Sequence, residues 1–535
     1  MIYLNRFFLK LHKQIRNFYL HSKIYDKKIS KTNNQNLVYK PSPHLLSSLI
    51  KYQKKRIKIN SLSIENFLIN ENIDKKEFKK LNTFNWFLSL DLKSSKKNVQ
   101  SVVSEWIRFN YKYNSESWEF GITAKRIIAW LSCHNLTISE SNKEYMSNFN
   151  NIIQKQTNHL ISEIEKVDTS DDKLIASAAI ILVGLSYRNE KIYLSNGIRA
   201  LKKISKISID SNGFPKSRNI KQLVFFLKYF ILIREWFKES HILLPEFINE
   251  TIYYLGQGYA FTWQNINSYM LFNGNNNSNN EEFDNYLKSL GYTFKNENLD
   301  FGGYAVLKNK KICLSMDVGS SPGVKYSQDY QSGALSFEII SNHKKLISNC
   351  GYYRKDNIKL NEISKSTAAQ NTLIIDDQSS CKFDKIGNLL LIKKGLRVSK
   401  KKTIFNKDYW KINASHDGYL KRYNSIHERS IEFFPNEMLF VGSDKIIKKN
   451  NKNYKFDIRF HVEPNVKIMK TQDNKTVLIE LENEGWRFTC ENYKIDIDNG
   501  LYFGNKNSYS ENQNFYITGI SNNLTENINW QLKRI

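Results

Sequence analysis

Residues 273–280, NGNNNSNN, stand close to the point where the periodicity of this sequence changes. Before them, apolar residues recur at the three- and four-residue spacing of amphipathic helices, and a last helix is expected near 281–290. From about residue 300, short apolar runs alternate with Asn, Asp and Gly at strand spacing. The sequence therefore predicts a helical part followed by an antiparallel β part, with the boundary near residue 295.

The helical part contains many segments separated by short polar turns. Residues 99–112 place four apolar residues on one helical face, Val102, Val103, Trp106 and Phe109, and residues 121–136 repeat the pattern. Antiparallel helices with short connections predict a bundle, solenoid or toroid, and the lack of a fixed-period repeat counts against standard solenoids. Further helices are expected at 150–166, 172–187, 193–206, 219–239 and 244–259. The runs beyond residue 300 predict a β-sandwich, so the fold class is α+β multidomain.

The composition of the chain describes a folded, strongly basic protein. Its 535 residues include 80 Lys plus Arg against 52 Asp plus Glu, a net charge of +28, and 41% are hydrophobic. The charge suggests an anionic partner, but the chain has no recognised nucleic-acid module, which argues against a nucleic acid. Lys outnumbers Arg 64 to 16, which is typical of biased composition. A retained Arg therefore suggests a site that needs a planar, bidentate donor.

Targeting and redox signals are weak in this sequence. The five cysteines are odd in number and widely spaced, which indicates neither a disulfide framework nor a zinc finger. The longest apolar run, 174–185, is shorter than the roughly 20 residues of a transmembrane helix. The start, MIYLNRFFLKLHKQIRNFYL, is basic and lacks the features of a secretory signal. A helix packed on the domain is favoured there over contact with a membrane surface.

Catalytic motifs of common enzyme classes are missing from the sequence. It contains no Walker loop, GxGxxG, HExxH or GxSxG. These absences argue against a nucleotide-dependent enzyme and against a simple serine hydrolase. One remaining constellation is SWEFG at 117–121, followed by Arg126. Two interpretations of Trp118 and Arg126 are about equally favoured. They could form an aromatic core with an ion pair, or they could form a platform on which a sugar stacks.

Three other constellations lie in loops and strand entries. In DSNGFPKSRN at 210–219, Arg218 and Asn219 would lie near a helix N-terminus, where an anion is favoured, although Asn219 could also simply cap the helix. The second is DVG at 317–319 followed by YQSGALSFE at 330–338, and the third is STAAQNT at 366–372. Both also fit ordinary turns that lead into strands.

Taken in order, these motifs resemble the heparinase II/III family of polysaccharide lyases, especially its divergent bacterial branch. The resemblance covers about 100–490 and rests on WEFGITAKRIIAW, DSNGFPKSRN, LFNG, SGALSFE, LISNCG, STAAQNTLIIDD, HDGYLKRY, HERS and RFHV. It implies an incomplete (α/α) toroid followed by an antiparallel β-sandwich. The implied domains are a basic N-terminal extension (1–44), a helical toroid (45–295) and a β-sandwich (296–535).

The resemblance implies a carbon-oxygen lyase that splits uronic-acid polysaccharides by β-elimination without a metal or other cofactor. The substrate carboxylate must be neutralised while a base removes the neighbouring proton. By position, Arg218 and Asn219 would neutralise the carboxylate, and Tyr330 would be the acid/base. His416 and His427 survive as further catalytic candidates. The expected substrate-binding residues are Trp118, Arg126, Asn273, Gln331, Gln370 and Asn371.

The sequence departs from the family at two positions. The usual His-x-His-x-Asp stretch is replaced around Tyr330 and Gln331, and the usual Ala-Ala-His is Ala-Ala-Gln at Gln370. Glutamine cannot act as a general base, so the expected base and the zinc ligands of some members are missing. Two hypotheses stay open: a lyase on an acidic polysaccharide, or a catalytically reduced carbohydrate-binding protein of the cell envelope. The resemblance implies an envelope or periplasmic location, with a cytoplasmic one left open.

Overall fold

The computed structural model describes residues 14–32, 37–50, 74–90, 95–187, 191–354, 357–387, 389–505 and 508–535. The chain forms two compact units, each discontinuous in sequence. The helical unit comprises Met1–Ser208, Phe225–Ile252 and Glu282–Tyr292, and the β unit comprises Ile209–Val224, Tyr253–Glu281 and Thr293–Ile535. Residues 1–13 of the predicted basic extension and residues 51–73 lie outside the described residues.

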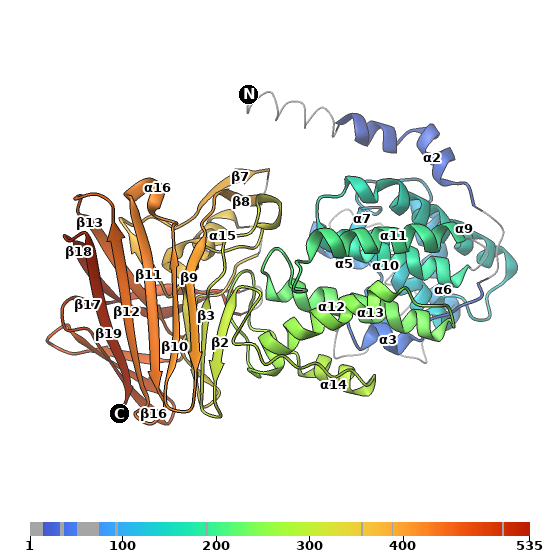
Figure 1. The fold of residues 1–535 in the computed structure, drawn as a ribbon. Coiled ribbons are helices and arrows are strands. Elements are labelled where there is room, and N and C mark those ends of the chain that lie inside the picture. Colours follow the sequence, from blue (N-terminus) through green and yellow to red (C-terminus); the bar gives the residue numbers. More distant parts are fainter. Residues whose placement is uncertain are drawn as a thin grey trace. The chain divides into compact units, whose positions relative to one another are not determined.

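The described residues up to 289 are mostly helical (Figure 1). The central α10 is apolar on all sides and is buried throughout its length after Lys173, as expected for a helix inside a bundle. Amphipathic α6 and α11 each bury one stripe of residues. The bounds are α2 Lys23–Ile29, α3 Pro43–Ser47, α5 Lys75–Asn82, η1 Asn85–Ser89, α6 Lys96–Asn110, α7 Phe120–Ser132, α8 His134–Thr137, α9 Lys143–Glu163, η2 Ile164–Lys166, α10 Ser170–Ser186, α11 Lys191–Ser208, α12 Ile220–Glu239, α13 Glu246–Tyr259, η3 Ala260–Gln264 and α14 Glu281–Ser289.

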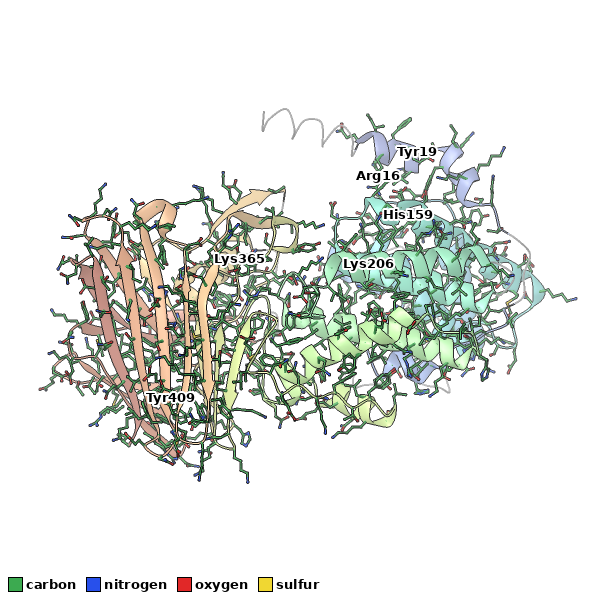
Figure 2. All side chains as sticks on the ribbon, in the orientation of Figure 1. Arg16, Tyr19, His159, Lys206, Lys365 and Tyr409 are labelled. Carbon is green, nitrogen blue, oxygen red and sulfur yellow. The ribbon has the colours of Figure 1, made fainter. Side chains whose placement is uncertain are left out.

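The described N-terminal residues, 14–32, pack on the rest of the helical unit, whereas most of the segment for which a packed helix was predicted, residues 1–20, lies outside the described residues. Tyr25 on α2 is fully buried, and its hydroxyl lies 2.7 Å from Nδ1 of His159 on α9. Arg16 donates from Nε to the Glu163 carboxylate at 2.8 Å, close to His159 (Figure 2). Among the described residues, no helix is both long and apolar enough to cross a membrane.

Antiparallel strands build the rest of the β unit. They form three larger sheets, with strand orders β1-β2-β3-β4-β5, β14-β15-β16-β19-β12-β11-β10-β9 and β17-β18-β13-β6, and a β7-β8 hairpin. The bounds are β1 Asp300–Phe301, β2 Tyr304–Lys308, β3 Ile312–Asp317, β4 Phe337–Ser341, β5 Lys344–Ile347, β6 Leu373–Ile375, β7 Lys382–Ile386, β8 Leu389–Lys394, β9 Val398–Phe405, β10 Trp410–His416, β11 Ser425–Phe434, β12 Leu439–Lys448, β13 Tyr454–His461, β14 Lys467–Lys470, β15 Thr476–Leu481, β16 Glu484–Thr489, β17 Lys494–Tyr502, β18 Ser510–Ser521 and β19 Thr525–Arg534.

Short helices η4 (Val324–Tyr326), α15 (Ile358–Lys365), η5 (Thr367–Ala369) and α16 (Leu420–Tyr423) interrupt the strands. One apolar core joins the three larger sheets. Phe337 on β4, Phe460 on β13 and Trp530 on β19 pack together there, with ring centroids 5.2–6.1 Å apart. Along β11, buried residues alternate with partly exposed ones, because successive side chains point to opposite faces of a sheet. The β unit is therefore a sandwich, as predicted.

Candidate functional site

Arg218 lies in the loop between α11 and α12, inside the β unit. Asp210 organises this loop by accepting the backbone N–H groups of Asn212 and Phe214, both at 2.9 Å. Arg218 has a left-handed backbone (φ 60°), and its guanidinium extends toward β2 and β3. A Cβ atom on Gly319 would lie 2.2 Å from the guanidinium carbon, so only glycine allows this close approach.

The Arg218 guanidinium is almost fully engaged by the protein. It donates from Nη2 to Asp317 Oδ1 at 2.6 Å and to the Gly303 carbonyl at 2.9 Å, and from Nη1 to the Gly319 carbonyl at 3.0 Å. Although burial acts in the opposite direction, the Asp317 carboxylate raises the pKa of Arg218. Arg218 is therefore a buried half of an internal ion pair rather than a free cation.

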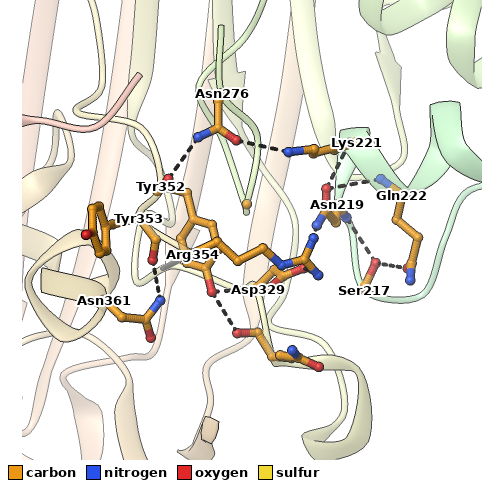
Figure 3. A network of polar contacts seen from close by, with 12 residues as sticks. Ser217, Asn219, Lys221, Gln222, Asn276, Asp329, Tyr352, Tyr353, Arg354 and Asn361 are labelled. Atoms are coloured by element: carbon orange, nitrogen blue, oxygen red, sulfur yellow. Dashed lines mark hydrogen bonds and ion pairs between the residues drawn. The ribbon is translucent and has the colours of Figure 1, made fainter. Parts of the chain in front are cut away.

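Asn219 caps α12 and joins the network at its more exposed end (Figure 3). Its Oδ1 accepts the N–H of Lys221 at 2.8 Å, and its Nδ2 donates to Asp329 Oδ2 at 2.9 Å. Asp329 also accepts from Arg354 at 2.9 Å and from the Tyr352 hydroxyl at 3.2 Å. The Arg354 side chain is 48% exposed, so the network reaches solvent here.

Asn273 links the arginine to the position of the expected base. Its Nδ2 donates to the Tyr304 hydroxyl at 2.8 Å and to Asp317 Oδ2 at 3.0 Å, while its Oδ1 accepts the Gln331 N–H at 3.3 Å. The Tyr304 hydroxyl donates in turn to the Arg218 carbonyl. The NGN turn thereby fixes both the arginine loop and the start of the YQSG segment.

Gln331 and Gln370, the two glutamines at expected histidine positions, meet at one backbone carbonyl. Gln331 donates from Nε2 to the Ser364 carbonyl at 2.6 Å and to the Gly351 carbonyl at 2.9 Å, and its Oε1 accepts the Gly274 N–H at 3.1 Å. Gln370 donates to the same Ser364 carbonyl at 3.4 Å. Both side chains are buried, so these amides hold the backbone together.

Tyr330 lies in a small apolar cluster with Ala334, Cys381, Ile392 and Leu396 and is fully buried. Its hydroxyl makes no hydrogen bond to an oxygen or nitrogen of the described residues and lies near the Cys381 thiol. Burial raises the pKa of Tyr330 well above its ordinary value, and this outweighs the opposite effect of the Arg218 cation. The expected phenolate is therefore disfavoured where the structure places this residue.

His416 on β10 and His427 on β11 are opposite each other in the sheet and fully buried. His416 Nδ1 accepts the Gly418 N–H at 3.1 Å, so Nε2 carries the proton and donates to His427 Nδ1 at 3.2 Å. His427 then donates from Nε2 to Asp444 Oδ1 at 2.6 Å, and Asp444 also binds Arg429 at 2.7 Å. Burial lowers the pKa of both histidines, so both stay neutral inside the sandwich.

Trp118 and Arg126 belong to the helical unit and are fully buried in its core. Arg126 donates to the carbonyls of Ser117 at 2.8 Å and Asn82 at 2.9 Å, and its guanidinium lies 4.0 Å from the Trp106 ring centroid. The aromatic-core alternative therefore describes this region, with backbone carbonyls in place of the expected ion pair. As placed, neither side chain offers a surface to a sugar.

Asn371 is buried beside Gln370 and joins three segments. It donates to the Phe337 carbonyl at 2.8 Å and accepts the His461 N–H at 2.6 Å. The structure thus brings together most of the predicted site residues, although the role of each stays a prediction. The connected set is Arg218, Asn219, Asn273, Gln331 and Gln370, with Tyr330 and Asn371 adjacent in sequence.

Sequence reasoning grouped Asp317 with the YQSG segment without giving it a role, and it passed over three other residues that hold this set together: Asp329, Ser364 and Lys365. Lys365 is buried, donates to the carbonyls of Gln328 at 2.5 Å and Leu390 at 2.7 Å, and has its pKa lowered by burial to about 8. Asp317 carried a usable signal, since it ends a run of buried strand residues as a carboxylate. Nothing in the sequence pointed to the roles of Lys365 and Ser364, because their bonds involve backbone carbonyl groups, which every residue has.

The expected zinc-ligand positions do not fit a metal ion. Zinc takes imidazole, thiolate or carboxylate ligands, whereas Gln331 and Gln370 present amides already bonded to the backbone. Within the described ranges, no three or more His, Cys, Asp or Glu side chains gather in a way that could hold a metal.

Comparison with known proteins places this network in a family context. Residues 294–531 match the family model described as Heparinase II/III-like, C-terminal. A crystal structure of heparinase III is similar, with 15% identity and a TM-score of 0.70, over 97% of this chain and 89% of that one. A mutant heparan sulfate lyase HepC from Pedobacter heparinus gives 12% identity and a TM-score of 0.67, over 95% and 85%. These similarities confirm the predicted toroid and β-sandwich fold, and no curated protein sequence matches the chain.

Proposed function

We propose that this chain, whose residues 294–531 match the Heparinase II/III-like, C-terminal family model, binds an acidic, uronic-acid-containing polysaccharide with strongly reduced or absent β-elimination. One observation carries the proposal. At the two positions where the family resemblance calls for histidine, Gln331 and Gln370 use their amides to hold backbone carbonyls. The fold of the polysaccharide lyases is retained. At the position of the expected catalytic base, a glutamine amide binds the backbone instead.

The remaining candidates for the base support the same proposal. β-Elimination requires a group that reaches the proton next to the substrate carboxylate and accepts it. The Tyr330 hydroxyl is buried, with a raised pKa that favours the protonated form. His416 and His427 are neutral, but their ring nitrogens are committed to a buried chain that ends at Asp444.

Arg218, which was predicted to neutralise the substrate carboxylate, already has an internal partner. Arg218 already binds the Asp317 carboxylate at 2.6 Å, so a uronate would have to displace a buried internal partner. Breaking such a pair leaves an uncompensated buried charge, which is costly. Binding of an acidic polymer is instead supported by the net charge of +28, which steers polyanions toward the protein. We place that polymer in the cell envelope, which fractionation of the source cells would test.

The test measures binding and elimination in the same samples. Purified protein is incubated with a panel of uronate polymers and one neutral polymer, and each mixture is assayed for retention of the polymer and for absorbance of the unsaturated product. We expect acidic polymers to be retained, less so at high salt, with no rise in absorbance. A rise that Tyr330→Phe abolishes would instead establish a lyase with tyrosine as its base. Failure of every acidic polymer to bind would overturn the proposal.

A further inference from the structure

The β unit contains a cavity of about 800 Å³ that the network around Arg218 does not line. It lies among the start of β7, the end of β8, the β8–β9 connection and the segment through α16. Its volume lies within the range of 300–1,000 Å³ usual for small-ligand pockets. It touches the network from outside, since Ser320, one of its lining residues, accepts a long 3.4 Å bond from Arg218 through its carbonyl.

Cationic side chains outnumber anionic ones among the residues that line this cavity. Of its lining residues five are cations, all exposed: Lys382, Lys394, Arg397, Lys421 and Arg422. None of the five forms an ion pair with another described residue, whereas neighbouring Lys393 is paired with Asp384 at 2.7 Å. The single lining carboxylate, Asp417, accepts the backbone N–H of Arg397 at 2.7 Å. Two of the sixteen arginines of this lysine-rich chain, Arg397 and Arg422, therefore line this one cavity.

Hydroxyl groups fix the shape of the cavity wall. Ser321 Oγ accepts the Leu396 N–H at 2.9 Å and donates to the Leu396 carbonyl at 3.1 Å, while Ser320 Oγ accepts the Val398 N–H at 3.0 Å. Another lining hydroxyl, Ser379 Oγ, accepts the Thr367 N–H at 3.1 Å. These bonds tie the loops together, so a ligand would meet a preorganised polar wall and lose little affinity to loop ordering.

The chemistry of the lining favours a sugar polyanion over a nucleic acid. Proteins that bind single-stranded nucleic acid stack bases on exposed aromatic rings. The aromatic residues of this lining are Tyr419 and Tyr423, which are only 1% and 8% exposed, so neither ring offers a stacking face. Cations and serine hydroxyls remain, and these suit carboxylate or sulfate groups together with sugar hydroxyls.

We propose that this cavity is a binding subsite for a short acidic saccharide segment that carries carboxylate or sulfate groups. The inference rests on the proposed function and names the place where part of the polymer is held. The exposed cations contact the acidic groups, and the polar wall contacts the sugar hydroxyls. Arg218 and Asp317 do not line the subsite, so binding there leaves their buried ion pair in place.

The test compares two triple variants of the full chain that remove equal charge. The variant K382Q/K394Q/K421Q removes three cations of the cavity, and K401Q/K407Q/K449Q removes three exposed lysines elsewhere in the β unit that form no ion pair with a described residue. All six positions are exposed, so both variants are expected to fold, which circular dichroism checks. The probes are a sulfated heparin tetrasaccharide, an unsulfated tetragalacturonate, neutral maltotetraose and a short single-stranded DNA.

We expect the cavity variant to bind one or both acidic tetrasaccharides at least about tenfold more weakly than the unmodified protein, because three exposed ion contacts are lost. The control variant should stay within about twofold. Equal losses in the two variants, or maltotetraose binding as tightly as the acidic sugars, would overturn the subsite. So would tighter binding of the DNA than of the sugars. Retention of long acidic polymers together with failure of both tetrasaccharides would overturn the subsite alone, leaving the proposed function in place.

Discussion

Arg218 Nη2 lies 2.6 Å from Asp317 Oδ1, and this buried ion pair joins the α11–α12 loop to the end of β3. The same carboxylate accepts the Asn273 amide through its other oxygen at 3.0 Å. One aspartate therefore orders two segments that are otherwise far apart in sequence. Because the Arg218 guanidinium makes its hydrogen bonds to other residues of the protein, its role in this chain is to hold the network together.

Asp317→Asn should destabilise the protein by about 3–5 kcal/mol, because it removes the negative charge that compensates the buried Arg218 guanidinium. Urea unfolding followed by tryptophan fluorescence measures the change. Glu482→Gln is the matched control: it removes the partner of Lys344 from an ion pair in which both side chains are more than half exposed. That loss should stay below about 1 kcal/mol. Similar losses in the two variants would contradict the structural role of Asp317.

Gln331→Glu should cost about 2–3 kcal/mol near neutral pH, because a carboxylate cannot donate to the Gly351 and Ser364 carbonyls. The loss should shrink as the pH is lowered, since a protonated carboxyl regains one donor and burial raises its pKa. Urea unfolding of both proteins between pH 7.5 and 5 measures the difference. Gln531→Glu, at an exposed position on β19, should change stability by less than about 0.5 kcal/mol. A pH-independent effect would exclude this explanation.

Stability should fall on acidification below about pH 6.5. Burial lowers the pKa of His416 and His427, that of His159 to about 4 and that of His461 to about 3. The unfolded chain then binds more protons than the folded one between each lowered pKa and the ordinary value. Each such histidine contributes a slope of about 1.4 kcal/mol per pH unit in that interval, with its full contribution to stability present above pH 6.5.

Thermal unfolding measured from pH 7.5 to 4.5 tests this slope. His461→Gln should flatten it, and replacement of the exposed His343 by Gln should leave it unchanged. A melting temperature that is constant over the whole range would show that these histidines are not buried in their neutral form.

The native protein should resist thiol alkylation. All five cysteines are free and buried, and burial raises the pKa of Cys133, Cys313, Cys350 and Cys381 to about 12. Since the thiolate is the reactive form, labelling with iodoacetamide at pH 8 should be negligible in the folded state and should reach five groups in denaturant. Mass spectrometry counts the labels. Rapid labelling of Cys381 in the native protein would show that the cavity opens further than the structure indicates.

Much of the fold followed from periodicity. Residues 219–239 were expected to be helical and form α12 (Ile220–Glu239), and 244–259 correspond to α13 (Glu246–Tyr259). The start of α9 was missed by seven residues, because polar Asn142 caps the helix with a bond to the Tyr145 N–H and polar side chains fill its first turns. Local pattern predicts elements well where one face is apolar, and helix ends less well.

The site could be predicted only as a set of residues, because their partners are distant in sequence. Motif order grouped Arg218, Asn219, Gln331 and Gln370, which the structure connects. Sequence spacing gave no means to pair Arg218 with Asp317, 99 residues later, or to foresee that Tyr330 would be fully buried. Whether a polar side chain serves a ligand or the fold depends on such long-range partners.

The most direct test of the central claim is the absorbance of unsaturated product, recorded while an acidic uronate polymer is demonstrably bound to the protein. With Gln331 and Gln370 in place of imidazoles and Tyr330 buried, we predict bound polymer and an absorbance that stays at the level of a protein-free control. A steady rise in absorbance, proportional to protein concentration and lost in Tyr330→Phe, would contradict the account and show that this chain retains β-elimination.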